Sequence, residues 1–362
     1  MRVHFDHQVF SLQSTGGNTR YHFELARHLA ANQEIFLGLT PTTMPFFDLA
    51  SESTRVVGRP TSLRPSAGLY MLNEALNSAY ALARGRFDIY HPTHHRFNSL
   101  IRARCMVVTN HDCTQEKFPE EFRYNERVLR YRKELFRRAD AIICISEASR
   151  QDLFRFYNVD PAKTRVIHHG LTRLARAQRP PAGLPGRDFV LYVGARAVYK
   201  NFRGLLHAFH DSGLHHSMDL LVLGGGPMSP DHAALIDSLG IAQAVVQVAS
   251  PPDTLLAEAY SRARLLAYPS WSEGFGFPPL EAMSFGCAVL VCNTSSLPEI
   301  CGDAPFYYEK DEPDSLCDTL LRAVSDETAR ATAVQRGYDV AARYSWEKCA
   351  AETLALYREV LA

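Results

Sequence analysis

The chain has 362 residues, of which 46% are hydrophobic and 22% charged, and its formal net charge is +0. This length exceeds one ordinary core and predicts two domains, and the composition excludes a disordered chain. A net charge of zero gives no field that would attract nucleic acid, and no apolar run approaches the roughly 20 residues that a membrane span requires.

Short apolar runs alternate with helical patterns through the first half of the chain, which is typical of βα units with a parallel sheet. The first run indicates a strand rather than the apolar part of a signal peptide. The predicted strands of this half are 2–6, 34–39, 88–92, 105–109, 141–146 and 164–168. The predicted helices are 18–31, 70–84, 122–138 and 147–157.

The second half repeats this scheme after a break at 173–187, where three prolines and two glycines predict an interdomain linker. An N-terminal domain, 1–172, and a C-terminal domain, 188–344, are therefore expected. The strands predicted in the second half are 189–194, 218–223, 244–248, 264–268 and 287–292. The helices are 201–212, 230–239, 253–262 and 279–286, with a last helix at 345–362 that is a candidate to pack back on the N-terminal domain.

The expected fold is α/β, with two Rossmann-like domains whose parallel sheets face each other across a cleft. Parallel sheets bind ligands at the carboxyl ends of their strands, so the cleft is the expected site. The eight cysteines form no Cys-x-x-Cys pair, and several lie in apolar runs. We interpret the cysteines as buried, reduced thiols, which indicates a protein located in the cytoplasm.

The most informative segment begins just after the predicted strand 264–268. Gly274 and Gly276 let the backbone approach a ligand closely, and the two prolines that follow suit a first helical turn. A glycine loop that opens a helix favours anions, because backbone N–H groups and the positive end of the helix dipole face the ligand. Glu273 and Glu281 can each accept hydrogen bonds from hydroxyl pairs. We therefore expect a site for an anionic diphosphate and a hydroxyl-rich sugar.

Glu273 and Glu281 have seven residues between them, in the run Glu-Gly-Phe-Gly-Phe-Pro-Pro-Leu-Glu-Ala-Met, which resembles the Glu-x7-Glu motif of glycosyltransferase family 4. The runs Gly-Cys-Ala-Val-Leu at 286–290 and Ser-Leu-Pro-Glu-Ile at 296–300 also resemble that family. The resemblance implies the GT-B architecture and a retaining enzyme that needs no metal or other cofactor. It also implies that Glu273 contacts the donor sugar and Glu281 the ribose hydroxyls. The donor-binding loop that it implies comprises Gly274, Phe275, Gly276 and Phe277.

A second patch follows the predicted strand 189–194. Gly194 ends the strand, and Arg196 and Lys200 precede a helix that Asn201 can cap. A guanidinium fork and an ammonium charge are the two usual ways to hold phosphate oxygens. By resemblance, Arg196 and Lys200 bind the donor and stabilise the charge that grows on the departing nucleotide. Without the neighbouring motif, two such cations are more often solvated surface residues.

The run Ser-Thr-Gly-Gly-Asn at 14–18 resembles the N-terminal glycine loop of the family, which approaches donor phosphate and acceptor. Gly16 and Gly17 are accordingly donor-side candidates, and Asn18 is an acceptor-side candidate; a plain turn is the alternative. The glycines at 224–226 lack a full Gly-x-Gly-x-x-Gly fingerprint and are interpreted as a tight loop.

A His-Asp pair follows the predicted strand 105–109. Family members carry a similar pair, in which the histidine lies near the reacting sugar, so we assign His111 to catalysis and Asp112 to the acceptor side. A structural histidine at a strand end is the alternative. His94 and His95 are further acceptor candidates. No His-x-x-x-His or Cys-x-x-Cys pair sits on a shared face, which argues against a zinc site.

Donor and acceptor identity rest on resemblance. The base is expected near Val248 and Ala249, where this chain lacks the aromatic-glycine pair usual in the family. The N-terminal run Phe-Ser-Leu-Gln at 10–13 and the residues of the Glu-x7-Glu motif resemble those of bacterial mannosyltransferases of surface polysaccharide assembly. This favours GDP-mannose as the donor and a glycan or lipid-linked saccharide as the acceptor.

The predicted helix 122–138 carries seven cations and two acids, with aromatic and leucine side chains between them. One interpretation is peripheral contact with an anionic bilayer at the inner face of the membrane. The other is a partly solvated helix whose arginine stems pack on the domain.

Retention of configuration requires either a covalent nucleophile or attack from the face of the leaving group. By analogy with the family, we hypothesise front-face substitution, in which the leaving phosphate takes the acceptor proton while Glu273 and His111 position the sugar. Another GT-B enzyme, such as a nucleotide-sugar epimerase or a phosphorylase, and a non-catalytic nucleotide-sugar-binding protein are the alternatives. A nicotinamide dehydrogenase is disfavoured because the full glycine fingerprint is missing.

Overall fold

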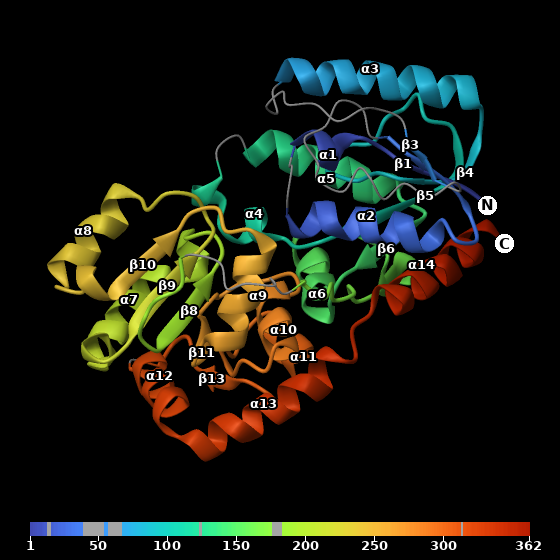
Figure 1. The fold of residues 1–362 in the computed structure, drawn as a ribbon. Coiled ribbons are helices and arrows are strands. Elements are labelled where there is room, and N and C mark those ends of the chain that lie inside the picture. The colour runs from blue at the N-terminus through green and yellow to red at the C-terminus, as the bar shows by residue number, and fades with distance from the viewer. Residues whose placement is uncertain (13–15, 39–53, 57–66, 123–124, 176–182, 313) are drawn as a thin grey trace. The chain divides into compact units, whose positions relative to one another are not determined.

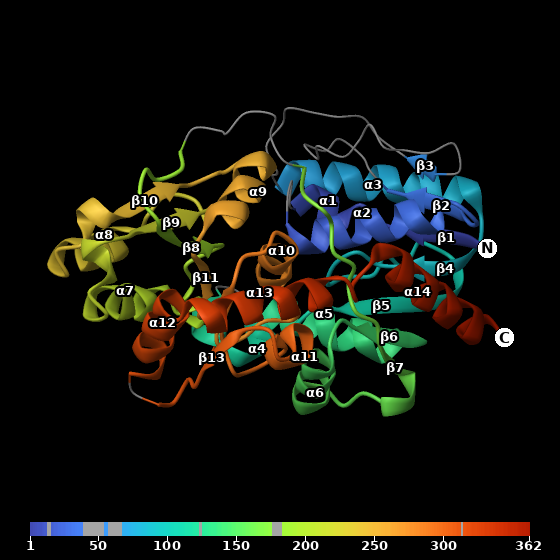
Figure 2. The ribbon, with the colours of Figure 1, turned by 60° about the horizontal axis from the view of Figure 1, so that its bottom comes forward.

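The computed structural model describes the chain except for residues 13–15, 39–53, 57–66, 123–124, 176–182 and 313. The chain forms two compact units, one of residues 1–170 together with 345–362, and the other of residues 171–344. Each unit is a parallel sheet accompanied by helices (Figures 1 and 2).

The N-terminal unit contains a seven-stranded sheet in the order β3-β2-β1-β4-β5-β6-β7, and every neighbouring pair is parallel. All four residues of β6 are buried, as expected for a parallel strand covered on both faces. The strands are β1 (Arg2–Phe5), β2 (Glu34–Leu37), β3 (Thr54–Val56), β4 (Phe87–His91), β5 (Ala103–Asn110), β6 (Ala141–Cys144) and β7 (Thr164–Val166).

The helices of this unit include the last one of the chain, which packs beside α2. Tyr357 of that last helix is fully buried, and its hydroxyl lies 2.6 Å from Nδ1 of His91 on β4. A Cβ atom at Gly170 would lie 2.2 Å from the backbone nitrogen of Trp346, so only glycine allows this close approach. The helices are α1 (Gln8–Leu12), α2 (Gly17–Leu29), α3 (Ala67–Arg84), α4 (Thr114–Lys117), α5 (Asn125–Arg138), α6 (Glu147–Phe156) and α14 (Trp346–Leu361).

The C-terminal unit contains a six-stranded parallel sheet in the order β10-β9-β8-β11-β12-β13. Apolar side chains of its strands and of α7 and α12 form one buried core. The strands are β8 (Phe189–Val193), β9 (Asp219–Leu223), β10 (Val245–Val248), β11 (Leu265–Tyr268), β12 (Val289–Cys292) and β13 (Phe306–Tyr308). The helices are α7 (Phe202–Asp211), α8 (Pro230–Ser238), α9 (Asp253–Arg262), α10 (Phe277–Ser284), α11 (Leu297–Cys301), α12 (Ser315–Ser325) and α13 (Glu327–Ala341).

Each strand and helix predicted from the sequence overlaps an observed one, and the differences lie in what was not predicted. β3 and β13, which have three residues each, were not predicted. α13 was missed because its buried side chains are mostly small, which gives a weak apolar period. Small residues are needed because α13 packs closely against α10. A Cβ atom at Gly337 of α13 would lie 3.0 Å from Met283 of α10.

The predicted linker 173–187 falls partly outside the described residues, and its described parts, 173–175 and 183–187, belong to the C-terminal unit. All eight cysteines are free, and six of them are buried. Within the described residues, no helix combines the length and the apolar character needed to cross a membrane.

Candidate active site

Two neighbouring strands at the centre of the C-terminal sheet place a lysine beside a glutamate. β8 and β11 are parallel and adjacent, so the loops that leave their carboxyl ends emerge at the same edge of the sheet. Lys200 lies in the 3₁₀ turn Val198–Lys200 that follows β8, and Glu273 lies in the loop after β11. Nζ of Lys200 is 2.6 Å from Oε1 of Glu273, and the two side chains are only 15% and 11% exposed. The structure therefore brings together two residues that are 73 positions apart.

Tyr268, the last residue of β11, fixes the position of this ammonium group. Lys200 Nζ donates to the Tyr268 hydroxyl at 3.2 Å and lies 5.3 Å from the centre of the tyrosine ring. Burial, together with the Glu273 carboxylate, raises the pKa of Tyr268 well above its ordinary value, so the phenol stays neutral. A carboxylate, a hydroxyl and an aromatic ring thus hold a single cation at the edge of the sheet.

The backbone of Glu273 is held by the loop that follows β12. The Glu273 N–H donates to Oγ of Ser295 at 3.1 Å, and the Glu273 carbonyl accepts from Ser295 at 2.8 Å and from Ser296 at 3.0 Å. Ser296 also lies within hydrogen-bonding distance, 3.1 Å, of the Phe275 carbonyl. These contacts order the glycine loop before any ligand arrives.

The start of α10 follows directly on this loop. Gly276 caps the helix with a φ of 106°, a left-handed conformation that favours glycine, and prolines occupy its first turn. Phe275 is buried and contacts the ring of Tyr344 edge-on at 5.5 Å. The positive end of the α10 dipole consequently adjoins the loop that carries Glu273.

Glu281, on α10, is only 6% exposed. Its Oε2 accepts a hydrogen bond from the hydroxyl of Tyr260 on α9 at 3.0 Å. Tyr260 was not singled out in the sequence, because nothing in a helix 21 residues upstream marks it as a partner of Glu281.

Arg196 has a different environment from Lys200. Its Nη1 donates to the Gly224 carbonyl at 2.9 Å, and its Nη2 lies 2.7–3.0 Å from the carbonyls of residues 225–227. A Cβ atom at Gly225, whose φ is 72°, would lie 2.5 Å from the Gly194 carbonyl. Arg196 therefore orders the glycine loop after β9.

Val248 and Ala249, the residues expected near the base, lie at the end of β10. Their carbonyls accept hydrogen bonds from the N–H groups of Gly224 and Gly226 at 2.9 and 3.3 Å. The side chain of Gln247 also donates to the Gly226 carbonyl at 2.7 Å. The glycine loop after β9 is thereby attached on both sides, to Arg196 and to the end of β10.

Comparison with known proteins decides the family. The family model "Glycosyltransferase Family 4" matches residues 15–172, and the model "Glycosyl transferases group 1" matches residues 176–340. O-antigen chain mannosyltransferase B of Escherichia coli is 30% identical over 373 residues, which cover 94% of this chain and 96% of that protein. The chain belongs to glycosyltransferase family 4.

Solved structures show the same fold. Sucrose-phosphate synthase from Thermosynechococcus elongatus matches with a TM-score of 0.78 and 21% identity over 99% of each chain. The Anabaena protein HepE in complex with UDP and glucose matches with a TM-score of 0.73 and 19% identity, over 98% of this chain and 99–100% of that one. The predicted α/β fold with two parallel-sheet units of the GT-B class is confirmed, and the chain is a glycosyltransferase.

The N-terminal unit of this glycosyltransferase carries the other candidate residues. Gly16 caps α2 and Gly17 is its first residue, whereas 13–15 lie outside the described residues. The Asn18 carbonyl lies 3.0 Å from Nδ1 of His22, and the rings of His22 and His111 are 5.6 Å apart.

Several polar atoms around these residues are buried and lack a hydrogen-bonding partner among the described residues. They are Oδ1 of Asn18, Oγ1 of Thr19, Nε2 of His22 and Nε2 of His111. Buried polar groups are usually paired, so unpaired ones gathered on one helix start and one strand end indicate a place for a hydroxyl-bearing ligand or water. Thr19 and His22 were not proposed from the sequence, although His22 lies one helical turn after Asn18.

The remaining acceptor-side candidates have local partners. Oδ1 of Asp112 accepts from the Thr114 N–H at 2.8 Å, at the start of α4. The rings of His94 and His95 lie 4.0 Å apart, and burial lowers the pKa of His94 to about 4.

Buried histidines make the stability of the glycosyltransferase depend on pH. Burial lowers the pKa of His4 to about 4 and that of His111 to about 3, and it holds the pKa values of His22, His91 and His169 well below the ordinary 6.5. The folded protein keeps these rings neutral, whereas the unfolded chain binds protons as the pH falls below about 6.5.

We therefore expect full stability above pH 7 and a progressive loss between pH 6.5 and pH 4. The slope for each such histidine is about 1.4 kcal/mol per pH unit. Urea unfolding at pH 7.5 and pH 5, followed by circular dichroism, measures it. Equal free energies of unfolding at the two values would contradict the neutral, buried state of these rings.

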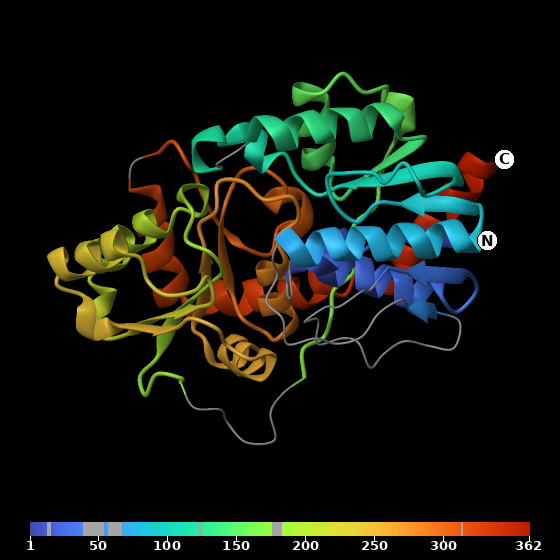
Figure 3. The ribbon, with the colours of Figure 1, turned by 90° about the horizontal axis from the view of Figure 1, so that it is seen from above.

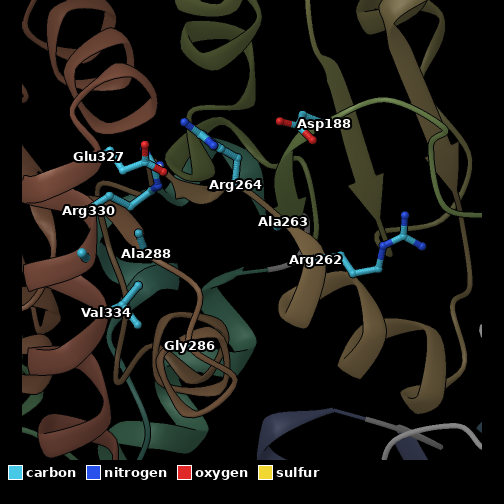
Figure 4. Close-up of a pocket in the computed structure, with 10 residues that line it drawn as sticks. Asp188, Arg262, Ala263, Arg264, Gly286, Ala288, Glu327, Arg330 and Val334 are labelled. Carbon is cyan, nitrogen blue, oxygen red and sulfur yellow. The ribbon is translucent and has the colours of Figure 1, made fainter.

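A separate pocket of about 440 Å³ lies in the C-terminal unit near the amino ends of β8, β11 and β12, which is the opposite end from Lys200 and Glu273 (Figure 4). Arg264 and Arg330 both donate to the carbonyl of Val324, at 3.4 and 2.8 Å. In Figure 4 the side chain of Arg262 extends away from these two. Two cations at the carbonyl end of α12 are favourable for that helix, which is a structural role.

Within the described residues, no group of three His, Cys, Asp or Glu side chains is placed to hold a metal ion.

Proposed function

We propose that this glycosyltransferase transfers mannose from GDP-mannose, with retention of configuration, to a glycan or lipid-linked saccharide during surface polysaccharide synthesis. The match to an O-antigen chain mannosyltransferase over nearly the whole of both chains supports the sugar and the acceptor class. The observation that carries the chemistry is the Lys200–Glu273 pair beside the glycine loop that opens α10.

The proposed donor site uses groups of both signs. Lys200 and the amino end of α10 supply positive charge for the diphosphate, and the backbone of residues 274–276 supplies close contacts. Glu273 and Glu281 supply carboxylates, which accept hydrogen bonds from sugar and ribose hydroxyls, respectively. Tyr260 would orient Glu281 for this contact, since it already holds Oε2.

The proposed reaction is a front-face substitution. The acceptor oxygen forms a bond to the anomeric carbon while the bond from that carbon to the β-phosphate oxygen breaks, and the acceptor proton passes to the departing phosphate. Lys200 stabilises the negative charge that develops on this phosphate. Because Arg196 is engaged with four backbone carbonyls, we assign it mainly to ordering the glycine loop and assign the leaving-group role first to Lys200. No metal ion takes part in the proposed scheme.

The acceptor would be bound by the N-terminal unit. The unpaired buried atoms of Asn18, Thr19, His22 and His111 support this assignment, because a saccharide hydroxyl can both donate to and accept from such groups. Neutral imidazole suits this role, and burial keeps the pKa of His111 at about 3. His94, His95 and Asp112 remain proposed acceptor contacts.

A donor panel tests this function. We expect GDP-mannose and GDP to raise the melting temperature at concentrations at which UDP-glucose, ADP-glucose and dTDP-glucose do not, because only the donor that binds stabilises the folded state. Proton NMR of the product formed with a mannose-terminated oligosaccharide acceptor should show the α-anomeric configuration of the donor.

Three outcomes would contradict the proposal, each in a different part. Stabilisation by UDP alone would overturn the base, and a β-linked product would overturn retention. Release of free GDP at the same rate with and without acceptor would favour an epimerase or hydrolase over a transferase.

A further inference from the structure

Arg132 belongs to the basic helix α5, but its side chain is buried inside the N-terminal unit and is only 4% exposed. Helix α5 packs against β5, the strand that ends at Asn110, and Figure 3 shows it in teal-green beside the strands of this sheet. Burying an arginine is costly unless its charge is paired and its N–H groups are hydrogen-bonded. The contacts of Arg132 therefore show what its burial achieves.

One nitrogen of this guanidinium contacts both neighbours of His111. Nη2 of Arg132 donates to Oδ1 of Asn110 at 3.0 Å and to the carbonyl of Asp112 at 2.5 Å. These two residues come immediately before and immediately after His111. The Asn110 amide is also held from its other end, since its Nδ2 donates to the carbonyl of Ser149 at 3.0 Å. A single side chain thereby holds the chain on both sides of His111.

The guanidinium is itself held in one position by a carboxylate and two aromatic rings. Nε of Arg132 lies 3.0 Å from Oε1 of Glu116, which is 5% exposed and also accepts from the hydroxyl of Tyr157. The guanidinium carbon lies 5.8 Å from the centre of the Tyr157 ring and 5.6 Å from the centre of the Phe136 ring. Its charge is thus balanced on one side, while Nη2 points to the chain around His111.

A buried ion pair is an inefficient way to stabilise a fold. The free energy needed to remove two charges from water can exceed their attraction, so an apolar pair of similar size is often equally stable or more stable. A buried pair with charge-assisted hydrogen bonds does fix a geometry, because these bonds are short and directional. The geometry that Arg132 fixes is that of the segment carrying His111.

The ring of His111 has an atom that is available to a ligand. Its Nε2 is buried and lacks a hydrogen-bonding partner among the described residues. The ring contacts Tyr21 edge-on at 5.2 Å and lies 5.6 Å from the ring of His169, and these contacts restrict its rotation. The place at which Nε2 meets a ligand then depends on the backbone that carries the ring. A misplacement of about 1 Å at a reacting centre can lower a rate by about 100-fold.

We propose that Arg132 is a positioning residue for glycosyl transfer, which holds His111 where its Nε2 meets a hydroxyl of the acceptor saccharide. This inference rests on the proposed function, in which His111 contacts the acceptor. Arg132 touches no substrate in this scheme and acts only through His111. The donor residues Lys200 and Glu273 belong to the other unit, so loss of Arg132 should impair the use of the acceptor and leave donor binding intact.

A double-mutant cycle on the full chain tests the proposal. Arg132→Lys keeps a cation for Glu116 but lacks the planar fork that reaches both neighbours of His111. It should lower kcat/KM for a mannose-terminated acceptor by about 10–100-fold and leave the KM for the donor unchanged. In a His111→Ala background the same change should have almost no further effect, because a residue that acts only through this ring cannot act once the ring is removed. Arg130→Met, at an exposed position of the same helix, is the matched control and should change neither background.

The double variant Arg132→Met, Glu116→Leu separates positioning from folding. It leaves no uncompensated buried charge, so most of the melting temperature should be retained, whereas kcat/KM for the acceptor should fall as it does in Arg132→Lys. NMR of protein with ¹⁵N-labelled histidines gives a second readout, which needs neither donor nor acceptor. The His111 ring resonances, identified by their loss in His111→Ala, should shift in the Arg132 variants and remain unchanged in Arg130→Met.

Two results would overturn the proposal directly. Equal losses from Arg132→Lys in the wild-type and His111→Ala backgrounds would show that the arginine acts on the fold in general. Wild-type acceptor kinetics or unshifted His111 resonances in the charge-free double variant would show that it does not hold the ring. Full activity of His111→Ala is a distinguishable failure, because it would remove His111 from the proposed acceptor site, and the positioning role of Arg132 with it.

Discussion

Replacing Lys200 by alanine is expected to lower kcat at least about 100-fold, which is the size of effect seen when one preorganised group at a developing negative charge is removed. The ammonium group is 15% exposed and is fixed by Glu273, the Tyr268 hydroxyl and the Tyr268 ring. Because it is held in place before the donor arrives, no reorganisation is needed when charge develops on the leaving phosphate. Initial-rate kinetics with donor and acceptor varied separately measure the effect.

Lys310→Ala is the matched control, since this exposed lysine lies 5.1 Å from the ring of Trp271 in the same unit and has no role in the proposed transfer. It should retain the wild-type kcat. If Lys200→Ala raised only the KM for the donor and left kcat intact, the lysine would be a ground-state binding group and the leaving-group role would be wrong.

Arg132→Met is expected to destabilise the protein by about 3–5 kcal/mol, because it leaves a carboxylate buried without its cation. Nε of Arg132 lies 3.0 Å from Oε1 of Glu116, and the side chains are 4% and 5% exposed. The same guanidinium donates to Oδ1 of Asn110 at 3.0 Å and to the Asp112 carbonyl at 2.5 Å. Chemical unfolding at pH 7.5, compared with the exposed-residue variant Arg130→Met, measures the difference.

The double variant Arg132→Met, Glu116→Leu sharpens this prediction. Removing both charges should recover much of the lost stability, because the penalty arises from the uncompensated carboxylate rather than from the loss of the pair. Single variants that each cost less than about 1 kcal/mol, as surface pairs do, would contradict a buried ion pair.

The local sequence pattern was sufficient to predict the donor loop. It was not sufficient to predict which distant residues contact that loop. Glycines, prolines and carboxylates within nine consecutive residues revealed the segment from Glu273 to Glu281. The partners of this segment come from distant strands and helices. Ser295 holds the Glu273 backbone from the loop after β12, and Tyr260 holds Glu281 from α9. Such contacts depend on strand order, which a single sequence does not show.

Charge counting was similarly incomplete for α5. The sequence left open whether the seven cations of the predicted helix 122–138 contact a membrane or pack partly on the domain. In the structure Arg132 is buried, and Arg137 and Arg138 are paired with Glu134. In contrast, the position of α3 was predicted, but the sequence did not show that its apolar residues face outward. Its apolar residues have a helical period, and a period does not indicate whether they face the core or the outside.

The return of α14 to the N-terminal unit affects how the protein is made. The buried Tyr357 and Trp346 belong to the core that contains β4 and α2, but they lie in the final 18 residues of the chain. During synthesis this segment emerges from the ribosome only after residues 171–344 have emerged. The unit that is synthesised first is therefore completed last, whereas the continuous unit 171–344 can close as soon as it emerges. A stop codon at position 345 would thus damage the half of the protein that lies farthest away in the sequence.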